Sequence, residues 1–226
     1  MPNDELLVEI LKCQNDTEIG RITLNSPETL NSLTLNMVND ISDLLDQWET
    51  NPKIKMILIG GTGEKAFCAG GDIRALYDSM CSPEGPIFAE NFFESEYRLD
   101  YKIHNFSKPI ISILDGIVMG GGAGLMFASS FKIATERTRF AMPEIGVGLF
   151  PDVGFTSVIK DLPEGLGLYI MLTSTQLNAA DTLFCQLTDC SLSSEDLGKF
   201  YKDIQKTEWK EGKKDNIKIL NSIVHQ

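Results

Sequence analysis

Apolar and polar residues alternate in two different rhythms along the first part of the chain. Residues 17–25, TEIGRITLN, change character at nearly every position, which predicts a strand. From Thr34, apolar residues recur at intervals of three and four as far as Trp48, so we expect an amphipathic helix that ends before Pro52. Residues 54–61, IKMILIGG, are a short continuous apolar run, the pattern of a strand buried on both faces.

Strand and helix patterns continue to alternate through the middle of the chain, which predicts an α/β architecture with crossover connections. The glycine-containing turns fall at the ends of strands, where α/β folds usually place their ligands. We expect a helix from Asp72, a helix over 86–106, a strand over 109–116, a glycine-rich turn entering a helix within 117–130, short strands within 131–136 and 139–144, mostly helix after 163, and a polar, charged segment over 206–214.

Composition narrows the possible partners of the protein. The chain has 226 residues, of which 42% are hydrophobic and 23% charged, as in an ordinary globular protein that forms one domain. A formal net charge of −12 argues against broad binding of nucleic acid or of an anionic membrane, because both need a basic surface. It does not exclude a small ligand that carries phosphate, which needs only a local cluster of donors.

Cysteine and histidine usage gives no sign of a metal site or a redox cofactor. The five cysteines are scattered without a CxxC pair, and the chain has two histidines, so we expect free thiols in a reducing compartment and no metal. No apolar run is long enough to span a bilayer. The first ten residues, MPNDELLVEI, are acidic and do not resemble a targeting segment, so a cytoplasmic location is the expectation.

Two glycine turns carry candidate chemistry. AFCAGGD (66–72) and MGGGAG (119–124) each follow a predicted strand and lead into a predicted helix, whose first N–H groups have no partner within the helix. Two such turns that converge would aim two amides at one negative oxygen and form an oxyanion hole. Glycines at such turns can also serve only close packing of helix and strand, and for either turn alone we favour that interpretation.

Other motifs with known chemistry do not fit this sequence. The first turn lacks the Lys-Ser/Thr ending of a P-loop, the second lacks the GxGxxG spacing of a dinucleotide site, and there is no GxSxG elbow. Cys68 lies in an apolar turn and is more simply a small buried residue than a nucleophile. Nothing in the pattern marks His104 as its base.

Two carboxylates stand out in the apolar segment RFAMPEIGVGLFPDVG (139–154). Glu144 and Asp152 each follow a proline, and proline holds the residue before it out of the helical region, so we expect a rigid, irregular loop. One of these acids could simply cap a helix or pair with Arg139. Two of them in one apolar loop point instead to a functional site, because carboxylates are rarely buried without a partner or a use.

These three segments together resemble the crotonase superfamily. KAFCAGGDI, MGGGAGL and FAMPEIGVGLFPDVG occur in its order and spacing, and the chain as a whole is similar to the branch of 3-hydroxyisobutyryl-CoA hydrolases. Supporting matches lie in ITLNSPETLNSLTLNM, FFESEYRLD, FKIATERTRFAMPE and LTSTQLNAADTLFCQL, so the resemblance covers roughly residues 8–190. It implies a ββα-spiral fold over residues 1–190, with an apparently shortened, mostly helical and polar C-terminal region over 191–226.

The resemblance also implies the ligand and the site residues. The partner would be an acyl-CoA thioester, with coenzyme A as part of the substrate and no separate cofactor. The amides of Gly71 and Gly121 would form the oxyanion hole. The further residues implied at the substrate are Ala69, Gly70, Asp72 and Gly120. Lys65 and Arg74 flank the first glycine turn and are the local candidates for the phosphates, although surface Lys and Arg are usually only solvated.

Position 124 separates the reaction classes within the superfamily. Hydratases carry a glutamate there, whereas this chain has Gly124 and keeps only the second acid, Glu144, so hydration by two glutamates should fail. The hydrolase branch has the pair that matches Glu144 and Asp152, with a third acid that matches Glu96. By this resemblance Glu144 acts on the thioester carbonyl, Asp152 holds the 3-hydroxyl of the substrate, and Glu96 lines the pocket.

Two departures from the branch leave alternatives open. Phe155 stands where the branch has small residues and would narrow the acyl pocket, and family members usually continue well beyond the point where this chain ends. The leading hypothesis is hydrolysis of 3-hydroxyisobutyryl-CoA or a close short-chain 3-hydroxyacyl-CoA, as in valine breakdown. The alternatives are an enoyl-CoA isomerase and a noncatalytic scaffold that binds coenzyme A. The habit of the superfamily suggests a homotrimer.

Overall fold

The computed structural model describes residues 4–225. Its strands form two β-sheets, and the chain passes repeatedly from one sheet to the other. Six strands form the larger sheet in the order β1-β2-β3-β5-β7-β10, in which β1 and β2 are antiparallel and the other pairs are parallel. Four strands form the smaller sheet in the order β4-β6-β8-β9. From β3 to β8, successive strands alternate between the larger and the smaller sheet, and a helix follows each pair. This is the ββα spiral that the family resemblance implies.

Five strands of the described chain fall in the segments predicted as strands, at 17–25, 54–61, 109–116, 131–136 and 139–144, and the other five were not predicted. The strand bounds are β1 Leu6–Lys12, β2 Glu18–Leu24, β3 Ile54–Gly61, β4 Ala66–Cys68, β5 Ile110–Leu114, β6 Ile117–Met119, β7 Phe131–Ala134, β8 Arg139–Ala141, β9 Leu177–Asn178 and β10 Cys190–Ser191. The first strand was not among the sequence predictions. It lies at the edge of the sheet with only Leu6 buried, because LLVEILK lacks the apolar alternation of a half-buried strand.

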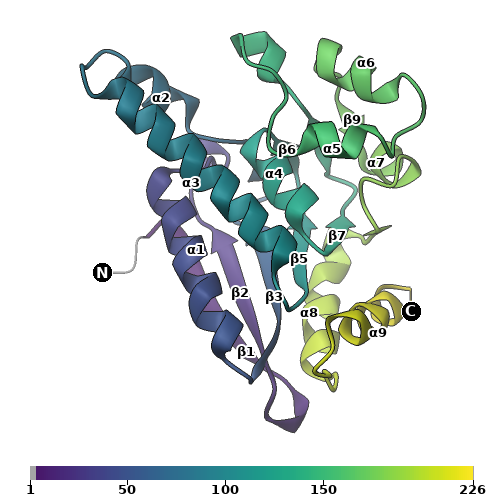
Figure 1. The fold of residues 1–226 in the computed structure, drawn as a ribbon. Coiled ribbons are helices and arrows are strands. Elements are labelled where there is room, and N and C mark those ends of the chain that lie inside the picture. Colours follow the sequence, from purple (N-terminus) through teal and green to yellow (C-terminus); the bar gives the residue numbers. More distant parts are fainter. Residues whose placement is uncertain (1–3, 226) are drawn as a thin grey trace.

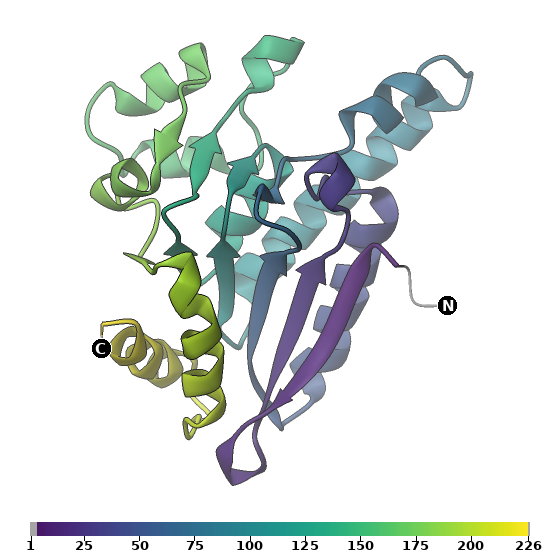
Figure 2. The ribbon, with the colours of Figure 1, turned by 180° about the vertical axis from the view of Figure 1, so that it is seen from behind.

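The α-helices cover the larger sheet from both sides (Figures 1 and 2). The α-helical bounds are α1 Leu35–Thr50, α2 Ile73–Ser79, α3 Gly85–Asn105, α4 Gly121–Ala128, α5 Phe155–Ile159, α6 Leu166–Thr173, α7 Ala179–Phe184, α8 Leu197–Gln205 and α9 Lys213–Val224. In Figure 1, α1 and α3 lie across the near face of the sheet, and in Figure 2 α8 lies across the opposite face. The predicted helices over 34–51, from Asp72 and over 86–106 are confirmed.

Strand β3 shows why the sheet needs cover on both faces. Ile57 and Ile59 belong to the core beneath α1 and α3, whereas Met56 and Leu58 belong to a second core on the other face. Side chains of a strand point to alternate faces, so the continuous apolar run of the sequence supplies both cores.

The C-terminal segment 191–226, which the sequence analysis separated from the rest, supplies part of the second core. Phe200, Ile204 and Trp209 are buried there together with Met56 and Leu58 of β3. The indole N–H of Trp209 donates to the carbonyl of Ile204 at 2.9 Å, which fixes the polar segment after α8. The charged stretch that begins at 206 is therefore a loop anchored by one buried aromatic residue.

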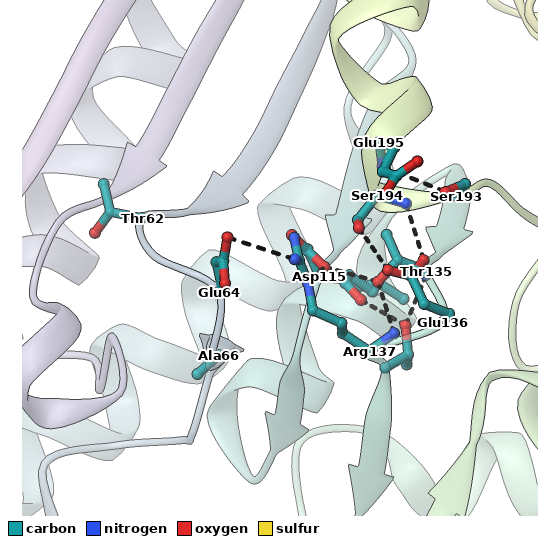
Figure 3. A network of polar contacts seen from close by, with 12 residues as sticks. Thr62, Glu64, Ala66, Asp115, Thr135, Glu136, Arg137, Ser193, Ser194 and Glu195 are labelled. Carbon is teal, nitrogen blue, oxygen red and sulfur yellow. Dashed lines mark hydrogen bonds and ion pairs between the residues drawn. The ribbon is translucent and has the colours of Figure 1, made fainter.

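A polar network fastens this C-terminal segment to the turns between strands (Figure 3). Arg137 forms a bidentate pair with Asp115, at 2.8 Å from Nε and 2.5 Å from the terminal nitrogen. Its neighbour Glu136 accepts hydrogen bonds from the backbone N–H and hydroxyl of Ser194, just before α8. Arg137 also lies 3.7 Å from Glu64, so the same arginine touches the loop that leads into the first glycine turn.

The segment with the two proline-preceded acids is only partly irregular. Glu144–Val147 forms one turn of 3₁₀ helix, which the expectation of an entirely irregular loop did not include. The preceding proline lies at the N-cap, where it needs no backbone N–H, so it is compatible with a short helix that begins at Glu144. This turn fixes the backbone from which the Glu144 side chain enters the interior.

Within the described chain, no helix has both the length and the apolar character needed to cross a bilayer.

Candidate active site

The two glycine turns predicted to converge do lie against each other. An ideal Cβ built on Gly70 would be 3.2 Å from the carbonyl oxygen of Met119 and 3.5 Å from the backbone nitrogen of Gly121. Gly70 has φ +109° and Gly120 has φ +50° with ψ −126°, conformations that favour glycine. The sequence therefore needs glycine here both for backbone conformation and for contact between the turns.

The backbone donors predicted for the oxyanion hole are placed at this contact. Gly121 is the first residue of α4, so its N–H has no acceptor within the helix. Next to Gly71, a bridge with Leu33 uses the carbonyl of Gly70 and the N–H of Asp72. This bridge leaves the N–H of Gly71 unused, and fixes the backbone on both sides of it.

Glu144 brings a buried carboxylate to the same place. Its Oε1 lies 3.5 Å from the position of a Cβ on Gly120, and neither carboxylate oxygen, both of them buried, has a hydrogen-bond partner among residues 4–225. Arg139, the possible ion-pair partner, donates instead to the carbonyls of Glu136 and Thr138. Burial, followed by the charge of Asp152, raises the pKa of Glu144 to about 7. A carboxyl with this pKa can accept and return a proton at neutral pH.

Glu96 is the most deeply buried carboxyl predicted for the site, with 3% of its surface exposed. It extends from α3 between the two turns: its Oε1 is 4.0 Å from the position of a Cβ on Gly71 and would overlap a Cβ on Gly121. Burial, followed by the charges of Asp152 and Glu144, raises its pKa to about 8. Glu96 is therefore mostly protonated at neutral pH, and the missing side chain of Gly121 makes room for it.

The raised pKa of Glu96 predicts a pH-dependent stability. The folded protein holds this proton up to about pH 8, whereas the unfolded chain releases it near 4.5, so the free energy of unfolding falls as pH rises between these values. We expect Glu96→Gln to be the more stable protein at pH 8, with Tm higher by roughly 2–4 °C for each kcal/mol gained, and to lose this advantage by pH 5. Thermal unfolding across this pH range, with the exposed Glu90→Gln on the same helix as control, measures the difference. A Tm difference independent of pH would contradict the assignment.

Asp152 is held by a residue that the sequence analysis did not select. The hydroxyl of Tyr97 donates to Oδ2 of Asp152, and Tyr97 directly follows Glu96 on α3. The position of Tyr97 next to Glu96 in FFESEYRLD is the sequence feature that could have identified it as a site residue. Burial and this hydrogen bond raise the pKa of Tyr97, so its hydroxyl stays protonated as a donor. Tyr97 thus orients one oxygen of Asp152 and leaves the other for a ligand.

Replacing Tyr97 by phenylalanine tests this orientation. Tyr97→Phe removes the hydroxyl and keeps the ring contact with Phe93. We expect kcat/KM to fall by about 10- to 100-fold, the effect of losing a hydrogen bond of about 1.5–3 kcal/mol to a charged group, with little change in Tm. Tyr77→Phe, which changes an exposed tyrosine on α2, is the control and should retain full activity. Unchanged kcat/KM in Tyr97→Phe would show that Asp152 needs no such support.

Gly124 is tightly confined by its neighbours. A Cβ on Gly124 would be 2.6 Å from Oδ2 of Asp100 and 2.9 Å from Cβ of Val153. A glutamate at this position would therefore need both residues to move. The structure gives a steric reason why the glutamate that a hydratase carries at position 124 has no place here.

A cavity of about 830 Å³ is lined by Asp100 and Asp152, whereas Glu96 and Glu144 are not among its lining residues. Asp100, Gly124 and Asp152 form one side of it, and α5 and the loop before it form another. Phe155, expected to narrow an acyl pocket, is not among the lining residues. It is fully buried and stacks on Phe127, with ring centroids 5.6 Å apart, so its role is to support the cavity wall from the core.

The other residues predicted for the site have simpler surroundings. Asp72 accepts a hydrogen bond from the N–H of Ala75 and caps α2, and the N–H of Ala69 donates to the carbonyl of Leu30. Lys65 and Arg74 are exposed on either side of the first turn, where a phosphate group can reach them. Contact of these four residues with a ligand remains a prediction.

Cys68 is not a nucleophile in this structure. It is fully buried, and burial raises the pKa of its thiol to about 12. Across residues 4–225, no group of three or more histidine, cysteine or acidic side chains is arranged to hold a metal ion.

Comparison with known proteins agrees with this fold. A family model described as enoyl-CoA hydratase/isomerase matches residues 19–226. The mitochondrial 3-hydroxyisobutyryl-CoA hydrolase of Danio rerio is 42% identical over 185 residues, which are 82% of this chain and 48% of that protein. The corresponding enzyme of Rattus norvegicus is 45% identical over 177 residues, 78% of this chain and 44% of that protein. The chain thus spans about half the length of these curated relatives.

A solved structure supports the fold over nearly the whole chain. The crystal structure of a carnitinyl-CoA dehydratase from Mycobacterium thermoresistibile is 33% identical, with a TM-score of 0.85 over 97% of this chain and 60% of that one. The resemblance seen in the three sequence motifs and the expected spiral fold are both confirmed. The chain belongs to the enoyl-CoA hydratase/isomerase family.

Proposed function

We propose that this protein hydrolyses a short-chain 3-hydroxyacyl-CoA thioester, with 3-hydroxyisobutyryl-CoA, an intermediate of valine breakdown, as the first candidate. The observation that carries the proposal is the unpartnered carboxylate of Glu144, which lies beside Gly120 at the contact of the two glycine turns. The relatives named as 3-hydroxyisobutyryl-CoA hydrolases support the choice of reaction and acyl group.

The reaction begins at the thioester carbonyl. Glu144 attacks the carbonyl carbon directly or removes a proton from a water molecule that attacks it. The carbonyl π electrons move to oxygen, and the N–H groups of Gly71 and Gly121 stabilise the negative charge. When the carbonyl re-forms, the C–S bond breaks and the coenzyme A sulfur leaves as a thiolate that takes up a proton. In the direct route, water then hydrolyses the mixed anhydride and frees Glu144.

Asp152 supplies recognition of the acyl group in this proposal. One of its oxygens accepts a hydrogen bond from the Tyr97 hydroxyl, and the other accepts a hydrogen bond from the 3-hydroxyl of the substrate. A site that hydrogen-bonds a substrate hydroxyl discriminates strongly against an analogue that lacks it, because its own polar group is then left unpaired. We therefore expect preference for 3-hydroxyacyl over plain acyl thioesters.

Two other functions make different predictions for the same assays. An enoyl-CoA isomerase can work with one acid and an oxyanion hole, but it has no use for a second carboxylate oriented by Tyr97. A noncatalytic protein would bind coenzyme A thioesters without turnover, and would gain nothing from a buried, unpartnered Glu144.

A panel of thioesters separates the three functions. The protein is incubated with 3-hydroxyisobutyryl-CoA, isobutyryl-CoA, 3-hydroxybutyryl-CoA and a 3-enoyl-CoA, while free thiol and double-bond migration are followed. Thiol release, fastest from the branched 3-hydroxyacyl ester, supports the proposal. Double-bond migration without thiol release would establish the isomerase. Calorimetric binding of the esters with neither reaction would establish a binding protein.

A further inference from the structure

Asp100 is a buried carboxyl that the proposed mechanism does not use. It lies one turn after Glu96 on α3, so the two side chains share a face of the helix. Part of the residue is exposed, but both of its carboxylate oxygens are buried and have no hydrogen-bond partner in the described chain. An ionised carboxylate without a partner is strongly unfavourable there, so its neutral form is expected.

Helix α4 provides the space for this carboxyl. Gly124 is an interior residue of α4, where glycine is less favourable than alanine. A Cβ at this position would lie 2.6 Å from Oδ2 of Asp100. The helix thus carries a less favourable residue at a position where a side chain would displace the Asp100 carboxyl.

The titratable groups around Asp100 are mainly acids. The groups that interact electrostatically with Asp100 are Glu96 and Tyr97 on α3, Cys68 on β4, and Asp152 in the loop before α5. Helix α4 contributes no titratable side chain. His104 and Lys132 line the same cavity and are the basic groups on this side. Burial, followed by the charges of Glu96 and Asp152, raises the pKa of Asp100 well above its usual range.

We propose that Asp100 is a positioning residue which, seated as a neutral acid in the space left by Gly124, keeps the negative charge of the site on Glu144 and Asp152. This inference rests on the proposed function for its effect on rate. When Asp100 loses its proton, another negative charge lies near Asp152 and Glu96 and opposes the negative oxygen that forms at the thioester carbonyl. Activity should then fall at alkaline pH.

The first test compares pH profiles of kcat/KM for thioester hydrolysis by the wild-type protein and Asp100→Asn, which keeps the neutral shape. We expect activity of the variant within about threefold of wild type at pH 6–7, and an alkaline fall displaced upward by about one pH unit or more. The control Glu90→Gln should follow the wild-type profile. Superimposable profiles of wild type and Asp100→Asn, or a loss of about 100-fold in the variant at pH 6–7, would overturn the proposal.

A second measurement needs no turnover and separates this inference from the proposed function. The carboxyl ¹³C resonance of Asp100, assigned by its absence in Asp100→Asn or, if that variant does not fold, in Asp100→Ser, is followed in the wild-type protein from pH 5 to 9. A resonance that keeps the protonated shift through pH 7 supports the inference, even if no thioester is hydrolysed. A titration complete below pH 6 would overturn it, even in a protein that hydrolyses thioesters well.

Discussion

Glu144→Gln is expected to lower kcat for thioester hydrolysis by about 10²–10⁴-fold while the protein stays folded. Glutamine has the shape of glutamate but cannot take a proton from water or attack a carbonyl carbon. The wild-type carboxylate has no hydrogen-bond partner that the amide would disturb. Its pKa of about 7 shows that holding it charged costs folding energy, so the neutral amide should raise Tm at alkaline pH.

A lower kcat together with a higher Tm in Glu144→Gln distinguishes a catalytic role of Glu144 from a structural one. Thiol release gives kcat, and thermal unfolding gives Tm for the same preparation. The exposed Glu164→Gln is the control and should change neither quantity. Normal turnover by Glu144→Gln would remove Glu144 from the mechanism, and a fall in Tm would show that its carboxylate serves the fold.

Gly121→Ala is expected to reduce kcat/KM by about 10²–10³-fold, the range found when an oxyanion donor is lost. The added methyl group would overlap Oε1 of Glu96 and lie 3.2 Å from a methyl group of Leu33. Because Gly121 begins α4, relief of this overlap must shift Glu96 or the N–H groups at the start of the helix. Either movement changes the contact between the two glycine turns.

Gly146→Ala is a matched control for this substitution. Gly146 lies in the 3₁₀ turn after Glu144, and a Cβ there meets no atom within 4 Å. The control should keep kcat/KM within about twofold of wild type, since isolated surface substitutions have small effects. If Gly121→Ala behaved in the same way, the amide of Gly121 would not be a donor in the transition state.

Much of the fold follows from local patterns in the sequence. Thr34 caps α1 by accepting a hydrogen bond from the N–H of Met37, and the three- and four-residue spacing after it matches the buried side of that helix. The apolar run of β3 supplies cores on both faces of the sheet. Edge strand β1 was not predicted, because the apolar residues Leu6, Leu7 and Val8 follow one another and do not alternate with polar residues. The strand forms through its pairing with β2, which local sequence does not reveal.

The candidate site was predicted in part from the sequence. The glycine turns and Glu144 were found from their unusual sequence context, and the structure brings them together. Tyr97 and Asp100 were missed because a tyrosine and an aspartate on an amphipathic helix look like ordinary partly exposed residues. Their importance depends on Asp152 and Gly124, which contact them across the fold and not along the chain. The cellular compartment and the assembly state stay predictions from the sequence.

The most direct test is the release of free thiol from 3-hydroxyisobutyryl-CoA by the purified 226-residue protein, measured beside isobutyryl-CoA, which lacks only the hydroxyl. We expect saturable hydrolysis of the hydroxylated ester, with kcat/KM higher by about 10²-fold or more than for the plain ester, and abolished by Glu144→Gln. Equal rates with both esters, or thiol release that persists in Glu144→Gln, would contradict a site built on Glu144 and Asp152.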